Sequence, residues 1–366
     1  MEQQSPSIKH YIFVLCGGTG PRLWPLSRKD NPKQFLSLLD KKSILEQTLK
    51  RSQRTVDPQN IYIVSGKNYF DKIIKIAKDF NLTKNVIIEP EKKNTALAIL
   101  YAVTKIKQID PNAVISTLPS DHYIKNISRF KQTLAKAKRI AQLTNTIVTI
   151  GIKPTKPDSS YGYIYPDKKI DDYYHVAKFI EKPDAKKAQD LIDKNSYWNS
   201  GIYTFSISTI LSEFEKLQPE YFSIFKRLEE NLNYPKKIEQ IYKESPDLAI
   251  DKAISEKSSK MTMVPATFDW SDIGEWETIF SKSIKRKDNN AIINSKTQFL
   301  TTNSQNCLIS GQDKKLIGLV GVNNLAVIDT PDALLVCNLD SSFNVRDLVS
   351  LMVKNKKYKV YFLGQK

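Results

Sequence analysis

A glycine-rich segment near the N-terminus is the first group of residues whose types and spacing could do chemistry. It covers residues 15–27, LCGGTGPRLWPLS, and contains Gly17, Gly18 and Gly20. Glycines after a strand let backbone N–H groups approach phosphate oxygens closely, so the segment predicts a phosphate-binding loop. It is not the Walker A motif, because no Gly-Lys-Ser/Thr follows, nor the G-x-G-x-x-G dinucleotide fingerprint. A plain glycine-rich turn is the alternative.

Two cations lie in the same connection. Arg22 stands directly behind the glycines, and Lys33 follows in the sequence PKQF. A guanidinium can donate two parallel hydrogen bonds to phosphate oxygens, and an ammonium acts on them as a point charge. Their presence favours the phosphate-binding interpretation over the plain turn.

The carboxylates of Asp121 and Asp272 are candidate metal ligands. Asp121 follows the apolar run 113–117, AVIST, at the C-terminal end of an expected strand, and Asp272 lies in WSDIG. Magnesium held by carboxylates is a usual means of neutralising phosphate groups during their transfer. Each aspartate taken alone is more often an Asx-turn or a helix cap. We assign no general base to His122, because a phosphate-monoester oxygen is already anionic near neutral pH.

Alternating elements are expected to position these residues over roughly the first 280 positions. Apolar, β-branched runs of strand length alternate with segments in which apolar residues recur at three and four. The runs are 11–15, 61–65, 85–89, 113–117 and 146–150, and the helical segments are 43–53, 68–81, 94–108 and 126–142. This pattern predicts a doubly wound α/β domain with a mostly parallel sheet, whose ligands bind at the carboxyl ends of the strands.

The pattern of strand-like and helical segments changes after about residue 285. The charged stretch KSIKRKDNN is followed by short strand-like runs separated by Gly, Asn and Pro, and helical period returns only near 343–353. Short strands with regular turns are typical of a small β-rich domain. We therefore predict a first domain over 1–284 and a β-rich C-terminal domain over 285–366.

Composition limits the class of protein. The 366 residues are 40% hydrophobic, which excludes intrinsic disorder, and carry a net charge of +17. Only nine of the 56 basic residues are arginine, which fits sequence-specific DNA recognition poorly. The cysteines and histidines lack zinc-site or disulfide spacing, and no run is long enough for a signal peptide or a membrane span. A cytoplasmic protein that binds neither nucleic acid nor membrane is expected.

The string GGTGPRLWPLSR with the following NPKQF resembles the phosphate-binding motif of the sugar-phosphate nucleotidyltransferases, in the form seen in mannose-1-phosphate guanylyltransferases. Further blocks resemble that family in the same order along the chain. They lie at 89–96, 119–122, 161–164, 179–183, 198–202, 269–274 and 328–333.

This resemblance implies nucleotidyl transfer from GTP to α-D-mannose 1-phosphate, giving GDP-mannose and pyrophosphate. The sugar phosphate would attack the α-phosphorus in line, with Mg²⁺ on Asp121 and Asp272. The implied catalytic residues are Arg22, Lys33, Asp121, Lys182 and Asp272. The implied nucleotide-binding residues are Gly17, Gly18, Thr19, Gly20, Arg22, Glu89, Asn94 and Thr95, and those for the sugar phosphate are Gly162, Glu181, Lys182 and Asn199.

Some features depart from the family pattern or leave alternatives open. Pro21 stands where the family usually has Thr or Ser, which removes one hydrogen bond to a phosphate. Asn94 and Thr95 are equally compatible with plain helix N-caps. The C-terminal part resembles the family's small left-handed β-helix and suggests docking or a homodimer. The chain ends before the isomerase domain of the larger bacterial members, so a single activity is expected.

Other functions remain as alternatives. The same chemistry with another hexose 1-phosphate or another nucleoside triphosphate would use the same residue types. A non-catalytic homologue that senses a sugar nucleotide would tolerate loss of charged site residues, yet all of them are present. A nucleic-acid binder has no motif behind it.

Overall fold

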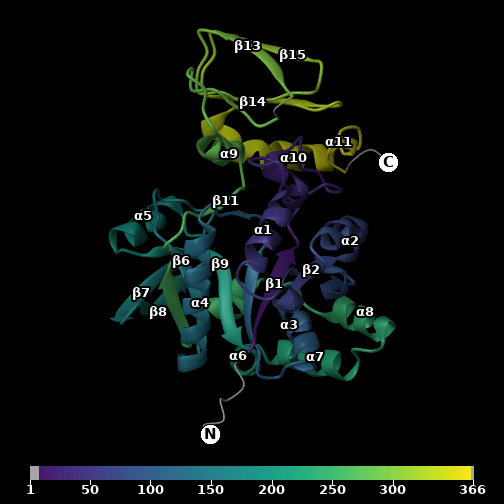
Figure 1. The fold of residues 1–366 in the computed structure, drawn as a ribbon, viewed down its shortest axis with the longest axis vertical. Coiled ribbons are helices and arrows are strands. Elements are labelled where there is room, and N and C mark those ends of the chain that lie inside the picture. Colours follow the sequence, from purple (N-terminus) through teal and green to yellow (C-terminus); the bar gives the residue numbers. More distant parts are fainter. Residues whose placement is uncertain (1–7, 295, 364–366) are drawn as a thin grey trace. The chain divides into compact units, whose positions relative to one another are not determined.

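The computed structural model describes residues 8–294 and 296–363, which form two compact units (Figure 1). Unit 1 contains the described part of Met1–Gly17, together with Leu49–Ser120 and Ile124–Trp270. Unit 2 contains Gly18–Thr48, Asp121–Tyr123 and the described part of Ser271–Lys366. Unit 2 therefore combines two N-terminal segments with the β-rich C-terminal part. The boundary between residues 284 and 285 stays a prediction.

Unit 1 is built on one large sheet with the strand order β3-β2-β1-β4-β9-β6-β10-β8-β7. Its strands are β1 (His10–Cys16), β2 (Ile61–Gly66), β3 (Val86–Glu89), β4 (Val114–Pro119), β6 (Ile147–Ile152), β7 (Tyr163–Ile170), β8 (Tyr173–Ile180), β9 (Tyr197–Ser206) and β10 (Met261–Pro265). Strands β8 and β9 run opposite to the others. The predicted mostly parallel α/β sheet is confirmed, and β1 lies inside it because its residues are apolar along nearly the whole run.

Helices cover both faces of this sheet. They are α2 (Phe70–Asp79), α3 (Asn94–Lys107), α4 (Ile127–Thr144), α5 (Ala185–Asp193), α6 (Ile207–Leu217), α7 (Pro219–Glu230) and α8 (Pro235–Glu244), and α1 (Ile44–Gln53) begins in unit 2 and ends in unit 1. Met263 belongs to the apolar cluster of α3, α6, α7 and α8, whereas the next residue, Val264, belongs to the cluster of α4. Because successive strand residues point to opposite faces, the two clusters lie on opposite sides of the sheet.

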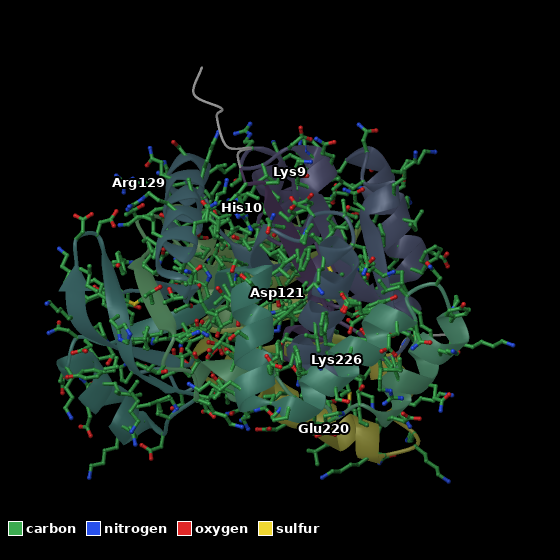
Figure 2. All side chains as sticks on the ribbon, turned by 90° about the horizontal axis from the view of Figure 1, so that it is seen from below. Lys9, His10, Asp121, Arg129, Glu220 and Lys226 are labelled. Atoms are coloured by element: carbon green, nitrogen blue, oxygen red, sulfur yellow. The ribbon has the colours of Figure 1, made fainter. Side chains whose placement is uncertain are left out.

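Most of the surplus basic residues are solvated. The basic residues Lys226 on α7 and Arg129 on α4 are exposed, as is the acidic Glu220 on α7, and Figure 2 shows their side chains among many others that project from the ribbon. Because exposed charges mainly affect solubility and weak binding, the positive net charge says little about the chemistry of the protein.

Unit 2 contains the β-rich C-terminal part. Its strands are β5 (His122–Tyr123), β11 (Ser271–Asp272), β12 (Ala291–Ile292), β13 (Gln298–Thr302), β14 (Leu308–Ser310), β15 (Leu316–Val320), β16 (Leu325–Asp329) and β17 (Leu334–Asn338). The pairs β12–β14, β14–β16 and β13–β15 are parallel, so successive short strands stack as in a β-helix. Helices α9 (Trp276–Lys282), α10 (Val345–Lys354) and α11 (Val360–Leu363) complete the unit.

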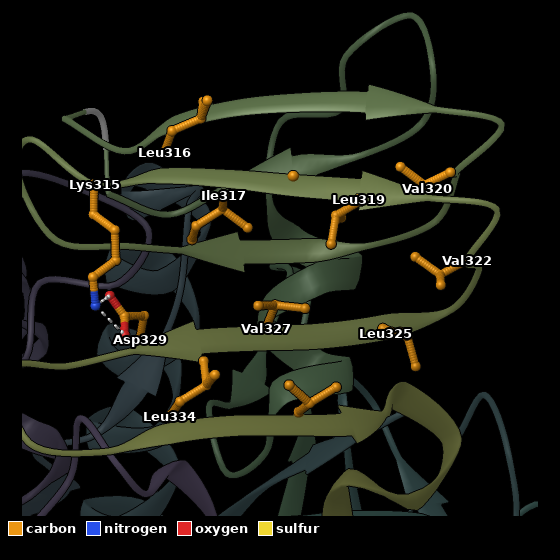
Figure 3. A pocket seen from close by; sticks show the side chains of 12 residues that line it. Lys315, Leu316, Ile317, Leu319, Val320, Val322, Leu325, Val327, Asp329 and Leu334 are labelled. Atoms are coloured by element: carbon orange, nitrogen blue, oxygen red, sulfur yellow. Dashed lines mark hydrogen bonds and ion pairs between the residues drawn. The ribbon is translucent and has the colours of Figure 1, made fainter.

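A groove of about 580 Å³ runs over β15, β16 and β17 (Figure 3). Apolar side chains line most of it, and Leu316, Val320 and Leu334 are largely exposed. Lys315 Nζ lies 2.9 Å from Asp329 at one end of the groove. Among the residues that the structure describes, no helix is long and apolar enough to cross a membrane.

Candidate active site

The predicted metal ligands Asp121 and Asp272 lie side by side in unit 2. Strands β5 and β11 pair in antiparallel fashion, with Asp272 opposite His122, and Asp121 is the residue before His122. Lys33 Nζ lies 2.8 Å from Asp121 Oδ2 and 2.7 Å from Asp272 Oδ1. Three residues far apart in sequence therefore form one compact charged cluster.

Electrostatics stabilises the charged forms of Lys33 and Asp121 in this cluster. The Lys33 side chain is only 10% exposed, and burial alone would lower its pKa. The charges of Asp121 and Asp272 outweigh burial and raise the pKa of Lys33. Burial would likewise raise the pKa of Asp121, but the Lys33 ammonium holds it below its usual range. At neutral pH the cluster is one ammonium between two carboxylates.

The glycine-rich loop is also part of unit 2 from Gly18 onward. Gly20 has a φ of 61° in the left-handed region, and a Cβ atom there would lie 2.8 Å from the Lys33 side chain, so only glycine fits. Pro21 begins a 3₁₀ turn, Pro21–Leu23, at a position where a missing N–H is tolerated. Ser27 Oγ donates to the carbonyl of Thr19 at 2.7 Å and closes the loop. Gly17, the last residue of its segment of unit 1, is exposed.

Arg22 is held by an aromatic ring from the C-terminal part of unit 2. Its guanidinium carbon lies 4.1 Å from the centroid of Phe343, and the guanidinium carbon of Arg346 lies 3.9 Å from the same centroid. A Cβ atom at Gly274 would lie 3.8 Å from Nη1 of Arg22. The cation–π contact fixes the direction of the Arg22 side chain.

The rest of the loop is anchored to C-terminal residues as well. Arg28 donates to both carboxylate oxygens of Asp332, at 2.8 Å and 2.6 Å. Trp24 Nε1 donates to the carbonyl of Tyr361 at 3.0 Å. These long-range bonds explain why the loop segment and the C-terminal part form one unit.

In unit 1 the predicted sugar-phosphate residues lie together. Lys182 Nζ lies 2.6 Å from Glu181 Oε1, at the end of β8. A Cβ atom at Gly162 would lie 2.8 Å from Glu181 Oε2, so a larger residue there would displace the Glu181 carboxylate. The backbone N–H of Asn199 on β9 donates to the carbonyl of Gly162 at 2.7 Å. Neighbouring strands thus bring the four residues to one place.

The region predicted for the base, also in unit 1, follows β3. Glu89 is buried, and burial raises its pKa to about 7, against a hydrogen bond from Tyr242 and the charge of Lys92. Tyr242 Oη donates to Glu89 Oε1 at 3.4 Å. Burial with so weak a donor favours the neutral form of this carboxyl more than exposure to solvent would.

Asn94 and Thr95 start α3, and Lys93 before them occupies the N-cap position without a side-chain capping bond. Asn94 Oδ1 accepts from the N–H of Thr95 at 3.0 Å, a local hydrogen bond in the first turn of the helix. Asn94 Nδ2 donates to Asp247 Oδ1 at 3.1 Å, and Thr95 Oγ1 accepts from the N–H of Ile250 at 2.9 Å. The segment before the π-helical turn Asp251–Ser255 therefore contacts both side chains, so the two residues link the start of α3 to that segment.

Three residues with clear structural links to the candidate site carried no assignment from the sequence. Asp251 is hydrogen-bonded to Asn199, Phe343 stacks on Arg22, and Asp332 pairs with Arg28. Asp332 lies in the block 328–333 that resembles the family, and this was its only signal. Asp251 and Phe343 have no local signature, because their partners are distant in sequence.

The donor set fits a divalent cation that substrate phosphates help to hold. One carboxylate oxygen of Asp121 and one of Asp272 contact Lys33, which leaves the second oxygen of each for a metal ion. Carboxylate oxygens are the ligands that magnesium prefers. The described residues contain no group of three or more His, Cys, Asp or Glu able to hold a metal alone. Magnesium usually takes one or two carboxylates together with phosphate oxygens and water, so two are enough.

Comparison with known proteins agrees with this fold. A family model described as nucleotidyl transferase matches residues 12–289, and one described as mannose-phosphate isomerase/GMP-like β-helix domain matches residues 298–352. The chain belongs to the nucleotidyl transferase family and is a nucleotidyltransferase enzyme. The predicted β-helix-like C-terminal domain is confirmed by the second match. Nucleotidyltransferases of this family generally use a divalent metal.

Individual relatives are similar to this chain over most of its length. A mannose-1-phosphate guanylyltransferase of Escherichia coli is 34% identical over 348 residues, 92% of this chain and 74% of the relative. The alginate biosynthesis protein AlgA of Pseudomonas putida is 31% identical over 347 residues, 93% of this chain and 70% of the relative. A solved structure from Thermus thermophilus, described as a mannose-1-phosphate geranyltransferase, has a TM-score of 0.85 at 28% identity, covering 94% of this chain and 99% of that chain.

Proposed function

We propose that the enzyme transfers the guanylyl group of GTP to α-D-mannose 1-phosphate, giving GDP-mannose and pyrophosphate. The observation that carries the proposal is the Lys33 ammonium between Asp121 and Asp272, beside the glycine-rich loop. The names of the guanylyltransferase relatives support the choice of GTP and mannose 1-phosphate. A cytoplasmic location and a homodimer stay predictions.

Unit 2 would bind the triphosphate. Asp121 and Asp272 would hold Mg²⁺, which supplies positive charge that neutralises the phosphates. The backbone of 18–20, with Arg22 and Lys33, donates hydrogen bonds to the pyrophosphate portion and stabilises the charge that grows on it as it departs. Because Phe343 already fixes Arg22, little reorganisation is needed during the reaction.

Unit 1 would bind the sugar phosphate. The Lys182 side chain is 61% exposed, so its ammonium can exchange Glu181 for the monophosphate of the substrate. Glu181 and the backbone at Gly162 accept and donate hydrogen bonds to sugar hydroxyls. The sugar phosphate is already anionic near neutral pH, so its oxygen attacks the α-phosphorus in line without a general base.

The base would lie at the region of Glu89, Asn94 and Thr95 in unit 1. Guanine presents neighbouring N–H donors, which a carboxylate can accept together. Glu89 is the carboxylate of this region, and in the free protein it accepts a long hydrogen bond from Tyr242 at 3.4 Å. A donor-rich base would supply further hydrogen bonds to it.

Initial rates of pyrophosphate release test the proposal. Rates with GTP, ATP, UTP and dTTP are compared on the 1-phosphates of mannose, glucose and galactose. We expect GTP with mannose 1-phosphate to exceed every other pair by at least about tenfold in kcat/KM. Preference for UTP or dTTP would contradict the guanylyl assignment, and preference for another hexose would contradict the mannosyl assignment.

The contact between Phe343 and Arg22 has a measurable consequence. Phe343→Leu removes the ring and is expected to lower kcat/KM for GTP by about 3- to 30-fold, because a cation–π contact is worth about 0.5–2 kcal/mol. Phe343→Tyr retains the ring and should restore the activity. Arg346→Gln removes the other cation on the same ring and is the control, with an expected change of less than about twofold. Equal activity of the leucine variant and the wild type would show that Arg22 does not depend on the ring.

The raised pKa of Glu89 predicts an unusual pH dependence of stability. Because the folded-state pKa lies near 7, above the ordinary value, the contribution of Glu89 to stability is fully present below the unfolded-state pKa of about 4.5 and is lost as pH rises through 7. The free energy of unfolding of Glu89→Gln, relative to that of the wild type, should therefore rise by about 2 kcal/mol when the pH is raised from 5 to 8. Urea unfolding at both pH values measures it, with the exposed Glu91→Gln as control. A difference between variant and wild type that does not change with pH would contradict the prediction.

A further inference from the structure

The segment 247–251 contacts both groups of predicted residues in unit 1. Asp247 accepts a hydrogen bond from Asn94, in the base region, at 3.1 Å. Asp251 accepts one from Asn199, among the sugar-phosphate residues, at 3.0 Å. The segment ends in the π-helical turn Asp251–Ser255, a type of turn that is frequent at functional sites.

The amide of Asn199 is fully hydrogen-bonded by the protein itself. Its Nδ2 donates to Tyr203 Oη at 2.9 Å and to Asp251 Oδ1 at 3.0 Å. Its Oδ1 accepts from Thr149 Oγ1 at 2.8 Å and from the N–H of Gly201 at 3.2 Å. Two donors and two acceptor positions are the whole capacity of an amide side chain. The Asn199 side chain therefore has no hydrogen-bonding position left for a ligand. It can affect ligand binding by orienting the side chains to which it is bonded.

Asp251 is the group at the end of this network, and its two oxygens differ. Oδ1 accepts from Asn199 and, at 2.7 Å, from Tyr203 Oη. No hydrogen bond joins Oδ2 to another residue in the described part of the chain, and the backbone N–H of Asp251 itself is the remaining donor near the carboxylate. The residue is half-buried, so part of it is open to solvent. The network holds the carboxylate in one orientation and leaves one oxygen open.

The surroundings raise the free energy of the charged Asp251 carboxylate in the free protein. Burial raises the pKa of Asp251, the hydrogen bond from Tyr203 opposes this rise, and the charge of Glu181 adds to it. A desolvated carboxylate oxygen without a donor costs free energy that a ligand donor would offset. The required partner is a neutral hydrogen-bond donor, because two neighbouring carboxylates repel a phosphate.

We propose that Asp251 Oδ2 accepts a hydrogen bond from a hydroxyl group of the sugar and so helps to select the hexose 1-phosphate. The proposal rests on the proposed function and adds a residue to it. Lys182 binds the phosphate of the substrate, and Asp251 with Glu181 binds its hydroxyl groups. Asn199 and Tyr203 are positioning residues, because they hold the Asp251 carboxylate without being free to meet the sugar themselves.

The isosteric variant Asp251→Asn isolates the open oxygen. Asparagine can still accept from Tyr203 and Asn199 through its carbonyl oxygen, and it places an NH₂ group where Oδ2 lies. We expect KM for mannose 1-phosphate to rise by about 10- to 100-fold, and KM for GTP to change by less than about twofold. Asp190→Asn, at an exposed position on α5, is the matched control and should leave both constants unchanged.

Deoxy analogues identify the hydroxyl group that is bound. The 2-, 3-, 4- and 6-deoxy derivatives of mannose 1-phosphate are compared as substrates of the wild type and of D251N. For one derivative the two proteins should have equal KM values, because the hydroxyl that Asp251 binds is missing. An unchanged KM for the parent sugar, or an equal penalty on every derivative, overturns the proposal.

Two further experiments cover the cases in which the variant is unstable or the enzyme prefers another sugar. If D251N lowers the unfolding midpoint by more than about 3 °C, Asp251→Glu, which keeps the charge and moves the oxygens, undergoes the same comparison. If the wild type prefers another hexose 1-phosphate, the proposed mannosyl specificity fails, and the deoxy series of the preferred sugar then tests Asp251 separately.

Discussion

Lys33→Met is expected to lower the free energy of unfolding by about 3–5 kcal/mol, because it leaves two partly buried carboxylates without their cation. Lys33 is 10% exposed and lies within 2.8 Å of Asp121 and Asp272. Methionine has a similar length and fills the same space, so the loss comes from charge rather than from a cavity. The kcat of the variant should fall by about 100-fold or more, because a cation that stabilises the departing pyrophosphate is gone.

Urea unfolding and single-turnover kinetics measure the two effects separately. Lys41→Met, at an exposed position in unit 2, is the control and should change stability by less than about 0.5 kcal/mol. Mn²⁺ or Mg²⁺ should raise the unfolding midpoint of the Lys33 variant more than that of the wild type, because the two carboxylates no longer have a protein cation. A variant as stable as the wild type would show that the cluster contributes no stability.

Asp272→Asn is expected to combine a similarly large loss of activity with only a small loss of stability. Lys33 retains Asp121, so the buried ammonium stays paired and the free energy of unfolding should fall by only about 1 kcal/mol. The kcat should fall by about 100-fold or more, and the magnesium concentration for half-maximal rate should rise, because one of two carboxylate ligands is neutral. Asp121→Asn should behave in the same way.

Titration of the rate with Mg²⁺ checks this expectation. The control is Asp313→Asn, in unit 2, whose exposed pair with Lys296 contributes little to stability. Wild-type activity in either Asp121→Asn or Asp272→Asn would contradict the assignment of these residues as metal ligands. Loss of activity without any change in magnesium dependence would assign them to the positioning of Lys33 instead.

Local signals were enough to predict the elements and the candidate loop. The apolar run 113–117 becomes β4, and the helical segment 126–142 becomes α4, because strand and helix periods are written in neighbouring residues. Gly20 was predicted in the loop because glycine tolerates a tight approach, and its left-handed φ and its closeness to Lys33 show why no other residue fits. The substrates were suggested by a resemblance in spaced motifs. They stay a proposal, which the names of the relatives support.

The sequence by itself determined the doubly wound sheet, the β-rich C-terminal part, and which residue types are available for phosphate chemistry. Only the tertiary structure decided that Lys33 bridges Asp121 and Asp272, that Phe343 holds Arg22, and that Asp251 completes the network of Asn199. The physical reason is the distance along the chain. Periodicity and turn chemistry act between neighbours, whereas hydrogen bonds and ion pairs between residues roughly fifty or more positions apart depend on strand order and register, which no local pattern records.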